Sequence, residues 1–280
     1  MLVEEIFQHY EALLQSGHIS EAGEFLEESA ASFALSGDTL AAASCYNELE
    51  GFWRVAGKKE KSYSAAEKAL SIMSENGLAD SLDYATALLN YATAKGAFGE
   101  NEEALEIYRK VEARYLELLP GDDYRLASLF NNMAQSLLRL NNIKEAEDYF
   151  ARSLRLLETM AGVDVEIATG RTNLAFCLTA QRRFDEAEEA LAKSEKFFEG
   201  AYDDPHHGGA LSCRGQLEYL KGNFEKAAAA YKTLADITER RYGRNMRYAG
   251  ACRSAAKALE AAGKTEEALR MRQLAESAAR

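Results

Sequence analysis

The sequence predicts an all-α protein, a right-handed α-solenoid of about seven helix pairs. Three observations favour this fold. A short motif that ends in a small residue recurs seven times, at intervals of 39 to 43 residues, and such a period is typical of stacked helical repeats. Proline occurs only at Pro120 and Pro205, so long helices are not interrupted. Hydrophobic residues make up 47% of the chain, enough for a continuous core.

The recurring motif is a short polar stretch that ends in alanine, five residues after a glycine or polar residue. Its copies end at Ala22, Ala65, Ala104, Ala146, Ala187, Ala227 and Ala268. An alanine at this position lets the second helix of a pair approach the first closely. A large residue four positions later, one helical turn along the same face, fills the space beside it. These residues are Leu26, Tyr108, Phe150, Leu191 and Tyr231.

Each element follows from apolar residues at steps of three and four, the period of a helix face. In the fourth repeat the first helix places Leu126, Leu129, Phe130, Met133, Leu137 and Leu140 on one face. Asn141-Asn142 then breaks the pattern, and the second helix buries Ile143, Ala146, Tyr149, Phe150, Leu154 and Leu157. Asn101, Asn223 and Thr265 are expected helix N-caps. The prediction is one array over 1–280, with repeats at approximately 2–37, 38–80, 81–122, 123–163, 164–205, 206–244 and 245–280.

Helix openings and linkers relate these repeats to a known family. The openings are FNNMA at 130–134, LNYA at 89–92 and TNLA at 172–175, and the linkers are PGDD at 120–123 and DDPHH at 203–207. On these residues the chain resembles a tetratricopeptide repeat protein. Its repeats of about 41 residues are longer than the usual 34 and are similar to those of kinesin light chain and bacterial relatives. The resemblance implies a concave groove that binds extended peptides.

The resemblance also implies that polar side chains on the first helix of each pair hold the peptide. Asn90, Asn132 and Asn173 stand two residues before a small packing residue, at spacings of 42 and 41, so they are expected to form a ladder. An amide donates and accepts hydrogen bonds, which suits a peptide backbone. The alternative is that these amides only bond neighbouring helices. The groove candidates are Asn90, Asn131, Asn132, Gln135, Arg139 and Asn173.

Charge is unevenly distributed along the chain. The net charge is −12, which argues against general binding of nucleic acid. The first 53 residues carry about −10 and residues 239–280 about +5. A basic cluster near the end is a candidate docking site for an acidic partner, including the acidic head of another copy, and weak head-to-tail self-association would follow. The alternative is a solvated end. The cluster consists of Arg240, Arg241, Arg244 and Arg247.

No motif indicates catalysis, a cofactor or a metal. Adjacent His206 and His207 would point about 100° apart on a helix, and no histidine pairs with a serine or cysteine nucleophile. The four cysteines lie far apart, which indicates buried thiols rather than disulfides or zinc ligands. No signal segment or apolar stretch of membrane-spanning length is expected. We therefore expect a bacterial, cytoplasmic protein with no catalytic activity, cofactor or metal.

The predicted function is a protein- or peptide-binding adaptor or scaffold that acts in trans through the groove. An intracellular receptor for a short regulatory peptide is the first alternative, and an enzyme accessory protein is the second. The expected partner is a protein or an extended peptide, with no nucleic acid and no membrane.

Overall fold

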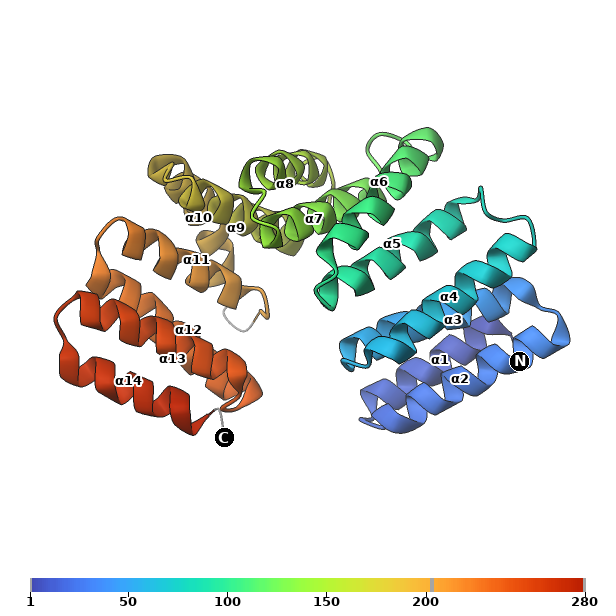
Figure 1. Cartoon of the computed structure of the whole chain (residues 1–280), viewed down its shortest axis with the longest axis horizontal. Coiled ribbons are helices and arrows are strands. Elements are labelled where there is room, and N and C mark those ends of the chain that lie inside the picture. Colours follow the sequence, from blue (N-terminus) through green and yellow to red (C-terminus); the bar gives the residue numbers. More distant parts are fainter. Residues whose placement is uncertain (1, 202–203, 279–280) are drawn as a thin grey trace. The chain divides into compact units, whose positions relative to one another are not determined.

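The structure is a computed structural model that describes residues 2–201 and 204–278. Over these residues the chain forms fourteen α-helices and no strand (Figure 1). The helices make seven consecutive pairs, so the prediction of an all-α repeat fold is confirmed. The chain divides into two compact units, Met1–Asn141 and Asn142–Arg280. Asp203 of the DDPHH linker lies outside the described residues.

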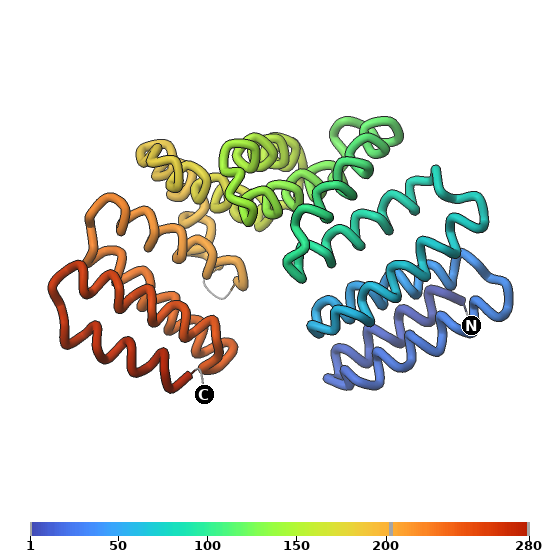
Figure 2. The backbone as a smooth tube through the Cα atoms, viewed as in Figure 1, coloured from blue at the N-terminus to red at the C-terminus, as the bar shows by residue number. Residues whose placement is uncertain are grey.

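In the first unit each helix packs on the next along the chain, and neighbouring first helices also touch, α3 with α5 and α5 with α7 (Figure 2). This places the first helices of successive pairs side by side. The helices are α1 (Val3–Gln15), α2 (Ile19–Ser36), α3 (Thr39–Val55), α4 (Lys59–Glu75), α5 (Leu82–Ala97), α6 (Asn101–Leu118) and α7 (Tyr124–Arg139).

The second unit repeats the arrangement, with each helix packed on the next and α9 also touching α11. Its helices are α8 (Ile143–Leu157), α9 (Asp164–Ala180), α10 (Phe184–Glu199), α11 (His207–Leu220), α12 (Phe224–Tyr242), α13 (Met246–Ala261) and α14 (Thr265–Ser277).

The small residue of the motif has the packing role that the sequence predicts. In six pairs it is the fourth residue of the second helix, at most 1% exposed: Ala22, Ala104, Ala146, Ala187, Ala227 and Ala268. In α4 the fourth residue is Ser62, not Ala65, although both are buried. The register of the second repeat therefore shifts by three residues. The intervals on either side of Ser62 become 40 and 42 residues, as regular as the rest.

One of the three expected N-caps is confirmed and two are wrong. Helices α6 and α14 begin at Asn101 and Thr265 themselves, so neither residue is an N-cap. Asn223 is the N-cap residue of α12, as expected, although its side chain makes no cap hydrogen bond and its amide donates to Glu218 at 2.7 Å. A nearby carboxylate thus binds this amide in place of the helix end.

Candidate functional site

A row of asparagine amides runs across the first helices of the first unit. Asn90 on α5 donates from Nδ2 to Asn47 Oδ1 on α3 at 3.0 Å. Asn132 on α7 donates from Nδ2 to Thr93 Oγ1 on α5 at 3.3 Å, and accepts from Asn131 at 3.4 Å. All of these side chains are half-buried. Two members of the predicted ladder, Asn90 and Asn132, therefore bond neighbouring helices of this unit and tie these helices together.

The row keeps hydrogen-bonding capacity for a ligand. An amide has two N–H donors and an oxygen with two lone pairs. Among the described contacts, Asn90 uses one N–H and Asn47 uses one lone pair. Asn132 uses one N–H and one lone pair. Scaffold bonding and ligand binding are thus compatible in the same side chains.

The other candidates on α7, Gln135 and Arg139, differ in their hydrogen bonds to the rest of the protein. Arg139 donates from Nη1 to the carbonyl oxygen of Gly96 at 2.5 Å, in the last turn of α5, where a cation suits the negative end of the helix dipole. Gln135 is exposed and has no partner among the described residues. Arg139 therefore secures α5 to α7, whereas Gln135 is open to a ligand.

The row in the structure differs from the predicted ladder at two residues, because it lacks Asn173 and includes Asn47. Asn173 is half-buried on α9, in the second unit, so the row within one unit is Asn47, Asn90 and Asn132. Asn47 was missed because the residue two positions later is Leu49, not the alanine that follows Asn90, Asn132 and Asn173. The signal that would have found it is its spacing of 43 residues before Asn90.

A pocket of about 600 Å³ opens beside the Asn47–Asn90 pair. Helices α1, α3 and α5 and the start of α2 form it. Its apolar lining includes two strongly exposed side chains, Ile19 at 51% and Val55 at 83%. The complete lining is Tyr10, Leu14, Ile19, Asn47, Glu48, Glu50, Gly51, Phe52, Arg54, Val55, Ala56 and Asn90.

Two carboxyl groups of this pocket have pKa values above the usual value for glutamate. Burial raises the pKa of Glu50 to about 7, against the opposing effects of Arg54 and Ser62. Glu50 is 1% exposed and accepts from Arg54 Nε at 3.1 Å. Partial desolvation by neighbouring helices also raises the pKa of Glu48, whose side chain stays exposed at the rim, and the charge of Glu11 adds to the shift. The main cause in both cases is desolvation, which disfavours the charged form of a carboxyl group.

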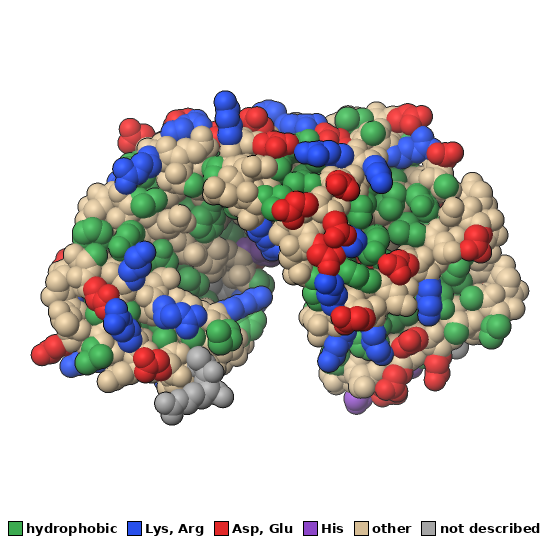
Figure 3. Space-filling view, viewed as in Figure 1, with side chains coloured by type: hydrophobic (Ala, Val, Ile, Leu, Met, Phe, Trp, Pro, Cys, Tyr) green, Lys and Arg blue, Asp and Glu red, His purple; other side chains and the backbone are tan. Residues whose placement is uncertain are grey.

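In the second unit three of the four arginines of the basic cluster lie against two tyrosine rings at the α12–α13 connection. Arg241 and Arg247 lie over the Tyr242 ring at 5.6 and 5.8 Å, and Arg244 lies over the Tyr248 ring at 5.7 Å. Arg244 also pairs with Glu239 at 2.6 Å. Figure 3 shows further Lys and Arg side chains where Figure 1 places α13 and α14. The tyrosines are the part of this patch that the charge pattern alone missed.

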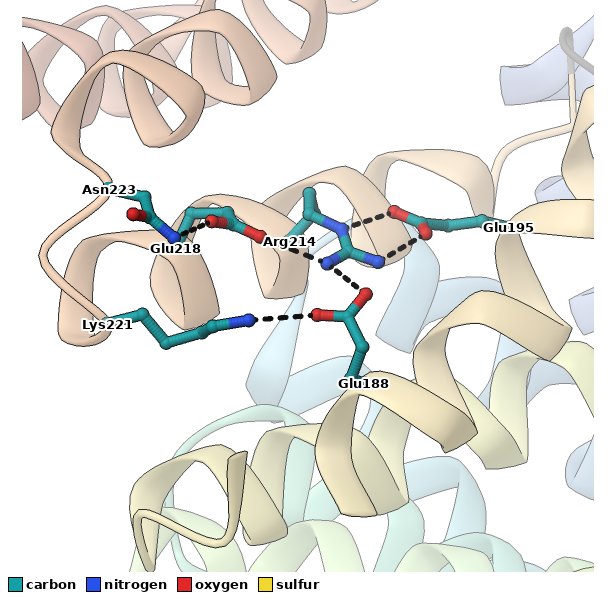
Figure 4. A network of polar contacts seen from close by, with 6 residues as sticks. All are labelled: Glu188, Glu195, Arg214, Glu218, Lys221 and Asn223. Carbon is teal, nitrogen blue, oxygen red and sulfur yellow. Dashed lines mark hydrogen bonds and ion pairs between the residues drawn. The ribbon is translucent and has the colours of Figure 1, made fainter. Parts of the chain in front are cut away.

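A second polar network of the same unit centres on Arg214 of α11 (Figure 4). Arg214 holds Glu195 of α10 through two hydrogen bonds, at 2.9 and 2.6 Å, and Glu188 at 2.6 Å. It also pairs with Glu218 at 3.2 Å. Since every donor of the network meets a carboxylate of the chain, we assign it to packing between α10 and α11.

The described residues contain no helix that is both long and apolar enough to span a membrane. Nor do they contain a group of three or more His, Cys, Asp and Glu side chains that could hold a metal ion. His207 is buried and His206 pairs with Asp204 at 2.9 Å, so the two histidines point to different surroundings.

The sequence comparison with family models gives one match. Residues 99–159 match a model of the tetratricopeptide repeat. No curated protein matches the sequence of the chain. The sequence likeness therefore covers α6, α7 and α8, and the likeness of the remaining helices rests on structure.

Solved structures share the fold over most or all of the chain. Apo RapI has a TM-score of 0.75 at 14% identity, covering 99% of this chain and 97% of its own. A Rap protein in complex with Competence and Sporulation Factor has a TM-score of 0.69 at 15% identity, covering 98% and 73%. Nearly identical tetratricopeptide-like repeats assigned to a kinesin light chain of Podosopora anserina have a TM-score of 0.57 at 15% identity, covering 70% and 95%. The predicted resemblance to kinesin light chain repeats and bacterial relatives is confirmed.

Proposed function

We propose that the chain is a non-catalytic adaptor that binds an extended peptide or protein segment along the first helices of its first unit. The observation that carries this proposal is the row Asn47, Asn90 and Asn132, whose amides bond neighbouring helices and keep free donors and acceptors. Amides spaced along adjacent helices can pair with successive groups of a peptide backbone, whatever its side chains. Gln135, Asn131 and Arg139 would complete the surface in this unit, and Asn173 is a separate candidate on α9 of the second unit.

Two observations favour one form of this function, a receptor for a short regulatory peptide. The fold neighbours include a Rap protein solved with Competence and Sporulation Factor, and the pocket beside Asn90 has the volume of small-ligand sites, about 300–1,000 Å³. An accessory role to an enzyme is the remaining alternative. The four cysteines are free and buried, which suits the reducing cytoplasm where we place the protein.

Replacing both Asn90 and Asn132 with alanine is the test of the amide row. A dodecapeptide selected on the immobilised chain from a random phage library serves as the probe. Loss of its hydrogen bonds should weaken binding by about 1–3 kcal/mol in isothermal titration calorimetry. The exposed amide variant Gln273→Ala on α14 is the matched control and should bind as wild type. Wild-type affinity in the double variant, with helical content unchanged, would refute the proposal.

We also propose that the basic patch around Tyr242 and Tyr248 docks an acidic surface, including the acidic head of another copy. Such head-to-tail contacts are heterologous and extend into open chains. Salt screens them over about 8 Å at physiological ionic strength, and exposed ion pairs are individually weak. Sedimentation velocity should therefore show weak association at low salt that disappears at high salt. Replacing Arg240, Arg241, Arg244 and Arg247 with serine should abolish it. A monomer at every salt concentration, together with partner binding by the serine variant equal to wild type, would contradict the proposal.

A further inference from the structure

The pocket beside Asn90 has an apolar wall that the fold leaves uncovered. Val55 is 83% exposed and Ile19 is 51% exposed, and both line the same hollow as half-buried Phe52. Scattered exposed apolar residues need no explanation, but apolar side chains that converge on one concave site are typical of ligand binding. A volume of about 600 Å³ is ample for a large apolar side chain.

The charge around the same pocket is negative. Glu48 and Glu50 line it, and the charge of Glu11 acts on Glu48. The sequence has no Lys or Arg before Arg54, so α1, α2 and most of α3 supply no cation. Arg54 is already bonded to Glu50 at 3.1 Å. Glu48, on the exposed rim, has the Tyr10 hydroxyl as its hydrogen-bond donor. A positive charge placed at this rim would be stabilised, and a second negative charge would be repelled.

We infer that this pocket selects a peptide segment in which a large apolar residue stands next to a Lys or Arg. The apolar side chain would fill the hollow against Phe52 and Val55, and the neighbouring cation would pair with Glu48. The Asn47–Asn90 pair at the edge of the hollow would hold the backbone between them. This inference rests on the proposed peptide-binding function and adds to it the class of ligand.

The experiment is phage selection of random dodecapeptides on the full chain, followed by calorimetry with synthetic peptides. Enriched peptides are expected to carry Lys or Arg beside a large apolar residue. Replacing that basic residue with glutamine should weaken binding to wild type about tenfold, the value of one close charge pair. Binding to Glu48→Gln should already be weaker by a similar factor. The affinity of Glu48→Gln should then be nearly the same for the peptides with and without the basic residue, because this variant can no longer form the charge pair.

The matched control is Glu28→Gln, which removes an equal charge from an exposed position of α2. It should leave both the affinity and the effect of the peptide substitution unchanged. Enriched peptides without a basic residue, or equal behaviour of Glu48→Gln and Glu28→Gln, would overturn the inference and leave the adaptor function standing. A library that yields no binding peptide at all would overturn both. Circular dichroism of each variant establishes that the helices are intact.

Discussion

Leucine in place of Ala187 is expected to lower the free energy of unfolding by about 1–3 kcal/mol, the usual cost of overpacking a filled core. Ala187 is fully buried, and its cluster includes Ala175 of α9 and Cys213 of α11. Three added carbon atoms must therefore displace neighbouring helices, because packed interiors hold few voids. The expected readout is a lower urea midpoint by circular dichroism.

The matched control for this substitution is Ala192→Leu, on the exposed side of the same helix. Leucine and alanine have similar helix propensities, so this variant should unfold close to wild type. Equal midpoints for Ala187→Leu and wild type would show that the motif alanine does not set the spacing of α9 and α10.

The repeat pattern predicted the helix pairs because it depends on side-chain size, which the sequence states directly. It predicted the second repeat less well for the same reason. A search for alanine selects Ala65, whereas the equivalent residue is Ser62, equally small and fully buried. Its hydroxyl donates to the carbonyl oxygen of Glu50 at 3.1 Å, a bond between α3 and α4 that an alanine could not form. This position therefore requires a small side chain, and either alanine or serine meets that requirement.

The sequence predicted which helices carry the candidate site, but not all of the residues that form it. The spacing of Asn90 and Asn132 placed both on first helices of adjacent pairs. Their hydrogen-bond partners depend on side-chain rotamers and on distances between helices, and residue spacing in the sequence contains neither. The pocket was not predictable at all, because α1, α3 and α5 contribute to it and its most exposed member, Val55, reads in the sequence as an ordinary apolar residue at a helix end.

Removing the cation of the Arg214 network should have the second large effect on stability. Arg214→Leu leaves three carboxylates without their shared partner, among them Glu218, which is 5% exposed. Breaking a fully buried pair costs about 3–5 kcal/mol. Because the Glu188 side chain is 39% exposed and water screens its charge, we expect about 2–4 kcal/mol here. Arg214→Lys keeps the charge but not the two-pronged geometry, so its unfolding midpoint should be intermediate.

The loss of stability caused by Arg214→Leu should depend on pH, and the charges of the network determine the direction. Burial would raise the pKa of Glu188, but hydrogen bonds from Arg214 and Lys221 and their charges outweigh it and hold the pKa below its usual value. A carboxyl whose pKa is depressed by folding contributes stability above its unfolded pKa, about 4.3 for glutamate. That contribution is lost as the pH falls through the folded pKa. The difference between wild type and Arg214→Leu should therefore be full at pH 7 and shrink below about pH 4.

Urea unfolding of both proteins from pH 7 to pH 3 measures this difference, with Arg253→Leu as the control at an exposed arginine of α13. Arg253→Leu should stay close to wild type throughout the range. If Arg214→Leu is equally destabilised at pH 7 and pH 3, its cost comes from lost packing of the arginine stem, not from unpaired carboxylates. A pH-dependent difference would instead show that charge contributes to holding α10 and α11 together.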